Sequence, residues 1–411
     1  MDSRIGRRIA YWRSRRRISQ EDFGALMGQS RRWVQALEGG QRQSDPRVSV
    51  LERAARVLQI PLGVLLADPP MRQCIDGVEL DAIRVALQRY DVLTGTTDDA
   101  DPMPVTELNA RLTHARAAFQ SGHYGSLGRH IPDLLIHTNR AAARLRGDDQ
   151  PAAYRTLAFT LELTEAAAVK YADADLALVS GHRAVAAAER SQDPVVMASA
   201  ARHLADAMTL HGQPRVAAQF ALAAAERLEA DLRGCGADGL SVLGMLFLKA
   251  AMAQAVTGAS DHPRAAVAAS AVPALLDQAD EHARELGTDG LNAVWTAFGE
   301  TNARLYRVAA HVQLSEGADA VAVARAIPDP ARAALPRERR AHLLTDLAEG
   351  LKQAGDRSAA VDTLLEAEEE AEEEVLCRPR THRIVEDLRL LGTGSADARL
   401  RALAARCGLT G

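Results

Sequence analysis

Apolar residues recur at helical spacing along nearly the whole chain, and no stretch shows the alternation of a half-buried strand. Near the N-terminus, Ile5, Ile9 and Trp12 form one apolar stripe. From residue 106 onward, segments rich in Ala and Leu are interrupted only by turn signals. The pattern therefore predicts an all-α chain.

The first 67 residues predict five short helices. Ser19 is placed to cap the second helix, which ends at Gly28, where a left-handed turn is easily made. Ser30 is placed to cap a third helix over residues 31–38. Two more short helices complete this segment, so the pattern predicts a small helical domain over residues 1–67.

The remaining chain predicts a connecting segment followed by repeated helix pairs. A helix is expected over residues 78–90, and residues 94–104 are rich in Thr, Asp and Pro, which predicts a linker and candidate hinge. Turns then recur about every 47 residues, each between two helices. They are expected at Gly122-His123, Ala172-Asp173, Gly212-Gln213, Gly258-Ala259, Gly317-Ala318 and Gly355-Asp356.

Charge separates the two parts of the chain. Residues 1–67 hold 13 Arg, no Lys and 6 acidic residues, a net charge of +7, whereas the whole chain carries −5. A basic head on an acidic body is expected if only the head meets a polyanion, although surface charge also clusters by chance. Arginine supplies nearly all the positive charge, since the chain has only three lysines, which we interpret as codon bias of a GC-rich genome.

Several function classes are not expected. The four cysteines, at positions 74, 235, 377 and 407, show no CxxC spacing, so neither a metal site nor a disulfide framework is predicted, and no cofactor is expected. The motifs GxSxG, HExxH and the P-loop do not occur, so we do not expect an enzyme. No apolar run approaches about 18 residues and no signal peptide is evident, which predicts a soluble, cytoplasmic protein without a membrane segment.

The run over residues 18–39 resembles the XRE family of phage-repressor-like helix-turn-helix domains. Its matching positions are Gln20 at the start of the second helix, Phe23, Met27, Val34 and Leu37 in the core, Gly28 at the turn, and Glu38 with its partner Arg13. Two positions depart from the family. Gly24 stands where alanine is usual, and Gln29 stands where an aliphatic residue is usual.

The resemblance implies that the third helix enters the major groove of double-stranded DNA and reads base edges with its N-terminal residues. Arginine can pair bidentately with guanine, and glutamine with adenine. The candidates for base contacts are Gln29, Ser30, Arg31, Arg32 and Gln35. Trp33 is a candidate for sugar-phosphate or thymine-methyl packing, and the candidates for phosphate contacts are Arg17, Gln20 and Arg42. A homodimer on a palindromic operator is expected, and a degenerate head used only for dimerisation or protein binding is the alternative.

The helix pairs after residue 106 resemble tetratricopeptide repeats, with small residues at the helix contacts and a Gly-Asp-like turn. The intervals depart from the usual 34 residues, so a divergent α-solenoid is expected, with an irregular all-α bundle as the alternative. The predicted domains are an XRE-type head over 1–67, a connecting helix and linker over 68–105, and a regulatory and dimerisation domain over 106–411.

The concave face of a solenoid offers a groove for a peptide, a small molecule or another protein. If one helix covers residues 295–306, then Trp295, Gly299, Asn302 and Tyr306 share a face of it. Arg202, His203 and Asp206 form a second polar group. The candidate effector-binding residues are therefore Arg202, His203, Trp295, Asn302 and Tyr306, and ordinary helix–helix contacts are the alternative. The acidic run over residues 366–374 is interpreted as a solvated helix face.

An XRE-type head joined to such a body resembles the one-component regulators of Gram-positive bacteria, including receptors for peptide pheromones. Richness in arginine and alanine suggests an actinobacterial member. The resemblance implies a sequence-specific transcription regulator in which a peptide or small-molecule effector shifts the conformation of the repeat domain. Two alternatives stay open: control by a partner protein bound in the groove, and a repeat scaffold without DNA binding.

Overall fold

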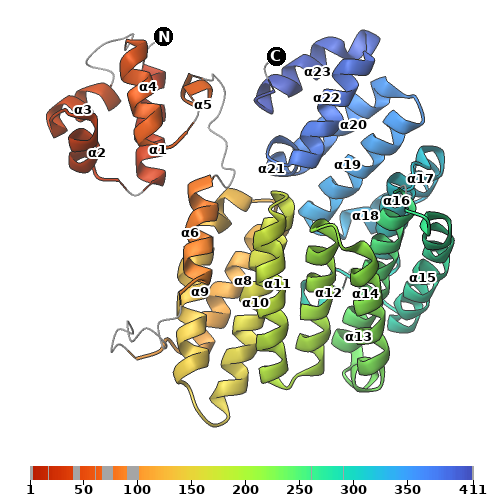
Figure 1. Ribbon diagram of the computed structural model, residues 1–411. Helices are drawn as coiled ribbons and strands as arrows, with labels where there is room; N and C mark the ends of the chain where they lie inside the picture. The colour runs from red at the N-terminus through yellow and green to blue at the C-terminus, as the bar shows by residue number, and fades with distance from the viewer. Residues whose placement is uncertain are drawn as a thin grey trace. The chain divides into compact units, whose positions relative to one another are not determined.

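The computed structural model describes residues 3–16, 18–39, 47–60, 62–66, 77–89, 101–260, 262–289 and 291–409. Over these ranges the chain forms α-helices and short 3₁₀ turns and no strand, so the expected all-α class is confirmed. The chain divides into two compact units, residues 1–72 and 73–411 (Figure 1). Each unit is described by itself below.

The first unit is built from five short helices around one apolar core. The helices are α1 (Ser3–Arg15), α2 (Gln20–Met27), α3 (Arg31–Glu38), α4 (Val48–Val57) and α5 (Leu62–Leu66). The apolar positions expected inside are buried, namely Ile9, Trp12, Phe23, Met27, Val34 and Leu37. They are joined by residues of α4 such as Leu51 and Ala54, so α1, α2, α3 and α4 share a single core.

The ends of α2 and α3 form as the local sequence predicts. The Ser19 hydroxyl accepts a hydrogen bond from the Asp22 backbone N–H (3.0 Å), and the Ser30 hydroxyl accepts one from the Trp33 N–H (3.2 Å). Gly28 ends α2 in the left-handed conformation, with φ of 67°. These caps satisfy backbone donors that the first turn of each helix leaves free.

Two glycines allow the helices of the first unit to approach closely. A Cβ at Gly6 would lie 2.3 Å from the Leu37 carbonyl oxygen, so α1 packs its backbone directly against the end of α3. A Cβ at Gly24 would lie 2.8 Å from the Gln29 carbonyl oxygen. The departure from alanine at Gly24 therefore fits a turn between α2 and α3 that leaves no room for a methyl group.

The second unit is a succession of longer helices. They are α6 (Gly77–Leu87), α8 (Val105–Gln120), α9 (Tyr124–Arg144), α10 (Asp149–Lys170), α11 (Ala174–Ser191), α12 (Pro194–Leu210), α13 (Pro214–Gly234), α14 (Gly236–Gly258), α15 (Ala265–Leu286), α16 (Glu300–Gln313), α17 (Gly317–Arg325), α18 (Asp329–Ala333), α19 (Arg337–Gln353), α20 (Arg357–Glu370), α21 (Glu372–Leu376), α22 (Pro379–Leu391) and α23 (Asp397–Arg406), with 3₁₀ turns η1 (Ala293–Trp295) and η2 (Gly394–Ala396). Consecutive helices from α8 to α14 pack against one another, and Figure 1 shows them roughly upright in the lower part of the view.

Each of the six expected turns separates two consecutive helices or lies at the end of one. Gly122, Gly212 and Gly355 have φ of 78°, 83° and 89°, and they join α8 to α9, α12 to α13 and α19 to α20. Ala172 holds the corresponding position between α10 and α11 with φ of 56°. The other two positions differ slightly, since Gly258 is the last residue of α14 and Gly317 is the first of α17.

The first helices of the pairs contact one another in a closed series. Helix α10 contacts α8 and α12, α14 contacts α12 and α16, and α19 contacts both α16 and α8. The contact between α19 and α8 brings the two ends of the series together. The first helix of each pair is therefore surrounded by other first helices. The face of these helices that was expected to line an open groove points into the protein instead.

Helix α6 belongs to the second unit, whereas residues 68–105 are expected to form a connecting helix and a linker between the two domains. It packs against α9, and its Ile83 and Leu87 are buried in the same apolar core as Leu127 and Ile131. Apolar side chains thus tie α6 to the helices that follow. Most of the expected linker, residues 94–100, lies outside the described residues.

Among the helices of the described ranges, α14 is long and apolar enough to cross a membrane by length and composition, whereas no such segment is expected from the sequence. In the structure, 67% of its most apolar stretch is buried inside the protein. It packs against α12, α13 and α15. Such burial is typical of the core helix of a soluble protein.

Candidate nucleic-acid interface and interior polar cluster

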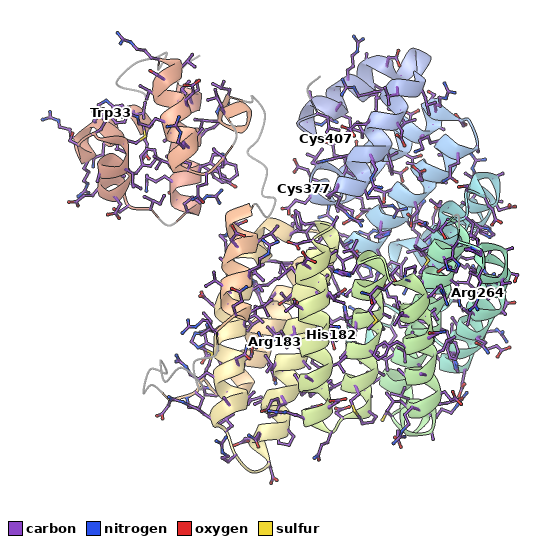
Figure 2. The ribbon with its side chains drawn as sticks, in the orientation of Figure 1. Trp33, His182, Arg183, Arg264, Cys377 and Cys407 are labelled. Carbon is purple, nitrogen blue, oxygen red and sulfur yellow. The ribbon has the colours of Figure 1, made fainter. Side chains whose placement is uncertain are left out.

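The candidate base-reading residues share the exposed face of α3 and the turn before it. Gln29, Ser30, Arg31, Arg32 and Gln35 are all exposed, whereas Val34 and Leu37 of the same helix point into the core. Trp33, labelled in Figure 2, is half-buried and packs against the core of the first unit, so only part of its ring is free for a ligand. The structure brings these polar residues together on one surface.

The orientation of α3 is fixed by a bridge from its last residue. Glu38 accepts hydrogen bonds from Arg13 Nε (2.6 Å) and Nη2 (3.0 Å), and Arg13 Nη1 donates to the Ile18 carbonyl (2.8 Å). Gln20 Nε2 also donates to Glu38 (2.8 Å). The amide expected to contact phosphate is therefore half-buried and engaged within the protein, while Arg17 and Arg42, the other two candidates, lie outside the described residues.

Four of the five candidate effector-binding residues are buried inside the second unit. Arg202 and His203 are 4% and 7% exposed, and Asn302 and Tyr306 are 0% and 8% exposed. Arg202, His203 and Tyr306 join charged side chains from neighbouring first helices in what we call the interior polar cluster. Its members are Arg116, Glu162, Glu165, Arg202, His203, Asp206, Lys249 and Tyr306.

The remaining candidate, Trp295, does not share a helical face with Asn302 and Tyr306. Helix α16 begins only at Glu300, after Gly299 in an extended conformation, and Trp295 lies in the short turn η1. The expected single face is therefore wrong. Residues 291–299 instead form an irregular segment, which we call the strap, that precedes α16.

Side chains hold the strap against three first helices. Gln120 of α8 and Asn292 exchange hydrogen bonds of 3.1 and 2.8 Å between their amides. The Trp295 ring packs edge-on against Phe159 of α10, and the Phe298 ring lies where α14 has Gly244, a position at which a Cβ would clash. Asn302 Nδ2 donates to a strap carbonyl, that of Thr296 (3.3 Å), so this amide is engaged within the chain.

The strap contains three non-glycine residues in the left-handed conformation. Val294, Trp295 and Ala297 have φ of 49°, 56° and 49°. Such residues cost of order 1 kcal/mol each or more, and they persist where the surrounding contacts fix them. The Trp295 ring lies 4.7 Å from the Arg116 guanidinium carbon, so the strap covers one side of the interior polar cluster.

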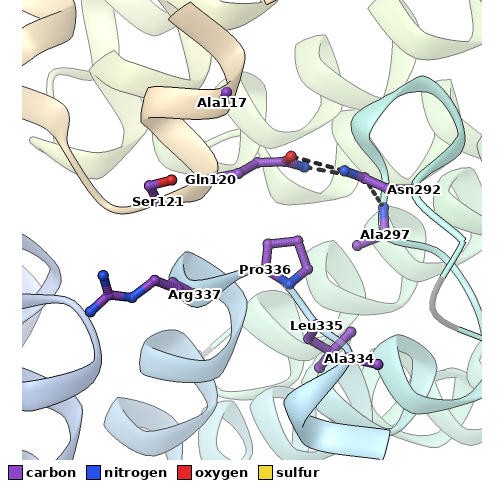
Figure 3. A pocket seen from close by; sticks show the side chains of 9 residues that line it. All are labelled: Ala117, Gln120, Ser121, Asn292, Ala297, Ala334, Leu335, Pro336 and Arg337. Atoms are coloured by element: carbon purple, nitrogen blue, oxygen red, sulfur yellow. Dashed lines mark hydrogen bonds between the residues drawn. The ribbon is translucent and has the colours of Figure 1, made fainter. Parts of the chain in front are cut away.

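A pocket of about 330 Å³ opens beside the strap, between α8 and the start of α19 (Figure 3). Asn292 and Ala297 of the strap line it together with Gln120 and Arg337. In Figure 3 the Gln120 and Asn292 amides meet across one edge of this pocket. Arg337 is its one charged lining residue, and its side chain also reaches Glu370 at 3.4 Å.

Within the interior polar cluster most charged groups have a partner. Arg116 Nη2 donates to Glu162 (3.0 Å), and Lys249 binds Asp206. His203 Nδ1 and Glu165 are 2.5 Å apart. Burial raises the pKa of Glu165 well above its ordinary value, with repulsion from Asp206 adding to it, and burial lowers the pKa of His203 well below 6.5. Burial therefore disfavours the charged form of each member, and one hydrogen bond joins the two.

A second buried group lies where α10, α19 and α21 meet. Lys170 binds both Glu338 and Glu374, and the Tyr124 hydroxyl donates to Glu374 (2.5 Å). Glu374 is 0% exposed and Glu373 9% exposed. The interpretation of residues 366–374 as a wholly solvated face is therefore wrong at its end, where the chain turns inward after α20.

His342 lies beside Glu338 and Glu374, close enough for the three residues to hold a metal ion. The Lys170 ammonium, however, donates to both carboxylates. A side-chain cation thus occupies the position that a metal would take.

Sequence reasoning missed most of the charged residues inside the second unit. Arg116, Glu162 and Glu165 lie in helices that read as ordinary Ala- and Leu-rich repeats. One signal was available. Of the three lysines in the chain, Lys170 and Lys249 are buried and paired, and Lys352 bridges Glu349 and Asp387 at 2.9 and 2.6 Å.

The chain matches no protein-family model and no curated protein. The function is therefore argued from the residues and geometry above.

Proposed function

We propose that this protein is a sequence-specific, DNA-binding transcription regulator, with its first unit as the reading head. The observation that carries the proposal is the exposed row formed by Gln29, Ser30, Arg31, Arg32 and Gln35 at the start of α3. These side chains can donate to base edges in the major groove. The caps at Ser19 and Ser30 and the left-handed Gly28 support a helix-turn-helix that presents the row on a rigid base.

The charge of the chain supports a polyanionic partner for this unit. Residues 1–67 carry +7, whereas the whole chain carries −5. Contacts to phosphates supply most of the affinity of such a head and orient it without reading sequence. Two heads are needed for a specific site, so we propose a homodimer on a two-fold symmetric, double-stranded operator.

For the second unit we propose a divergent α-solenoid with tetratricopeptide-like repeats that serves regulation and dimerisation. The alternation of paired helices and left-handed turns from α8 to α20 supports this assignment. The effector is a small molecule or a short peptide held among the first helices. Its binding shifts the population of the conformations that present the heads.

The proposal is tested by binding of the purified full-length chain to fragments of the genome that encodes it. We expect a small subset of fragments to be retained, and their affinity to fall steeply between low and physiological salt because bound counterions are released. Absence of retained fragments at low salt would instead favour the scaffold without DNA binding. A protein that co-purifies with the chain and reduces its DNA binding would favour control by a partner protein.

A further inference from the structure

The guanidinium of Arg202 has no carboxylate partner, whereas the other charged groups near it are paired. Arg202 is on α12 and is 4% exposed, and its Nε atom is enclosed without a hydrogen-bond partner. Over the described ranges, neither a hydrogen bond nor an ion pair engages this side chain. Removing a charged group from water is unfavourable unless a partner compensates it.

The neighbouring charges do not supply that partner. Glu162 is taken by Arg116 and by the Ser199 hydroxyl (2.9 Å), and Asp206 is taken by Lys249. Glu165 is taken by the ring nitrogen Nδ1 of His203 (2.5 Å). Each of the three carboxylates of the cluster is thus engaged by another side chain and none binds Arg202, so an anionic group of a ligand would supply its missing partner.

The same cluster also contains unpartnered carboxylate oxygens and one unpartnered ring nitrogen. Oε1 of Glu162, Oε1 of Glu165 and Nε2 of His203 are enclosed without hydrogen-bond partners. A dianion such as phosphate would be repelled by the carboxylate oxygens. A carboxylate with an N–H group next to it would satisfy both kinds of atom, since it offers an anion to Arg202 and a donor to the acceptors.

We propose that Arg202 is the anchor of an interior ligand site, and that the ligand carries a carboxylate with an adjacent N–H donor. Two sources share this chemistry: a free amino acid, with its ammonium group, and the C-terminal residue of a peptide, with its amide. The guanidinium binds the carboxylate through two parallel N–H···O bonds. Glu162 and Glu165 accept from the ligand nitrogen. The inference rests on the proposed function, because this ligand would be its effector.

The strap is the part of the wall that we expect to move when the ligand binds. Trp295 covers the Arg116 side of the cluster, and the pocket of about 330 Å³ lies on the strap's flank. Three left-handed residues weaken the strap's own conformation relative to the regular helices around it. Displacing it would connect the pocket to the cluster.

The test uses the full-length chain and measures ligand binding, not DNA binding. One probe is a mixture of the free proteinogenic amino acids, and the other is a mixture of N-acetylated dipeptides with free carboxylates. Each is compared with the same mixture as carboxamides by equilibrium dialysis and thermal unfolding. We expect at least one carboxylate mixture to bind and to raise the unfolding temperature of the second unit, and its carboxamide counterpart to do neither. The mixture that binds identifies the source.

Variants assign the binding to Arg202. Arg202→Gln is expected to lower the affinity for the bound carboxylate about tenfold or more, because a charge-assisted pair is lost. Arg202→Lys keeps the charge but not the two-bond geometry, so it too is expected to bind more weakly, and it serves if the glutamine variant does not fold. Arg264→Gln, at an exposed arginine labelled in Figure 2, is the matched control and should bind as the wild type does.

Three results would overturn the proposal: equal binding of carboxylate and carboxamide, unchanged affinity in both Arg202 variants, or no binding of either mixture. In the last case internal water satisfies the cluster. Each of these outcomes leaves DNA binding by α3 intact, so failure of the interior site is distinguishable from failure of the proposed function.

Discussion

At the scale of single residues, the turns between paired helices show what the sequence reveals and what it conceals. Gly122, Gly212 and Gly355 mark left-handed turns that their residue type predicts, because glycine adopts positive φ without strain. Ala172 occupies the corresponding position with φ of 56°, and an alanine there does not predict the left-handed conformation. The turn could be predicted from the repeat spacing, but the backbone strain at Ala172 could not.

We predict that Ala172→Gly stabilises the second unit by about 1 kcal/mol, because it removes the Cβ that disfavours the left-handed conformation. Denaturant unfolding of the full-length chain, followed by circular dichroism, measures the change. Ala110→Gly, at an exposed position inside α8, is the control and is expected to destabilise by about 1 kcal/mol. Equal destabilisation by both substitutions would show that Ala172 is not held in the left-handed conformation.

At the scale of elements, Glu38 ties three helices of the first unit together. It accepts from Arg13 of α1 and from Gln20 of α2 while it ends α3. The pairing with Arg13 was implied by the family resemblance, and the structure contains it. The role of Gln20 was not foreseen, because its position at the start of α2 is equally compatible with phosphate contact and with an inward hydrogen bond.

Glu38→Ala is expected to destabilise the first unit by about 2 to 4 kcal/mol, since it leaves the half-buried Arg13 guanidinium without its carboxylate. Hydrogen exchange of the backbone amides in α1, α2 and α3 measures this loss separately from the second unit. The control is Glu52→Ala, at an exposed glutamate of α4, for which we expect a change within about 0.5 kcal/mol. Undiminished protection in Glu38→Ala would contradict the bridging role.

The start of α16 after the strap could not be predicted from the periodicity of the sequence. Trp295, Gly299, Asn302 and Tyr306 have helical spacing, yet the helix begins only at Glu300. Asp289 explains part of the difference, because its carboxylate binds the Thr301 hydroxyl and accepts from the Thr301 N–H (3.4 Å). A contact across twelve residues of irregular chain starts the helix late, and no local pattern encodes it.

At the scale of the whole molecule, the all-α class and the helix pairs could be predicted, but the inward orientation of the charged face could not. It depends on α19 meeting α8, a contact between distant parts of the chain. The few lysines of the chain also have a structural role. Lys170 donates to two glutamates at once, which suits the compact, three-donor ammonium better than a planar guanidinium.

The interior charges predict how stability depends on pH. Because burial and nearby cations hold the pKa of His203 well below 6.5, the folded state keeps it neutral while the unfolded state binds a proton below that pH. The contribution of His203 to stability is therefore lost as pH falls below about 6.5, by up to about 2 kcal/mol between pH 6.5 and 5.

His203→Gln is expected to flatten the dependence of the unfolding free energy on pH in this range. The control His114→Gln, at an exposed histidine of α8, should leave the dependence as in the wild type. Denaturant unfolding at a series of pH values between 5 and 7 provides the comparison. A slope unaltered by His203→Gln would mean that His203 has an ordinary pKa in the folded protein.

The central claim is that α3 reads a DNA sequence, and the most direct measurement is the sequence preference of the doubly substituted chain Arg31→Ala/Arg32→Ala. Selection from random duplexes with the full-length chain would compare it with the wild type and with Arg47→Ala/Arg56→Ala, which removes the same charge from exposed positions before and within α4. We predict that the α3 variant loses sequence preference, since each bidentate base contact contributes about 1–3 kcal/mol of discrimination. The control is expected to bind more weakly but to select the same sequence. Selection of the wild-type sequence by the α3 variant would contradict the account.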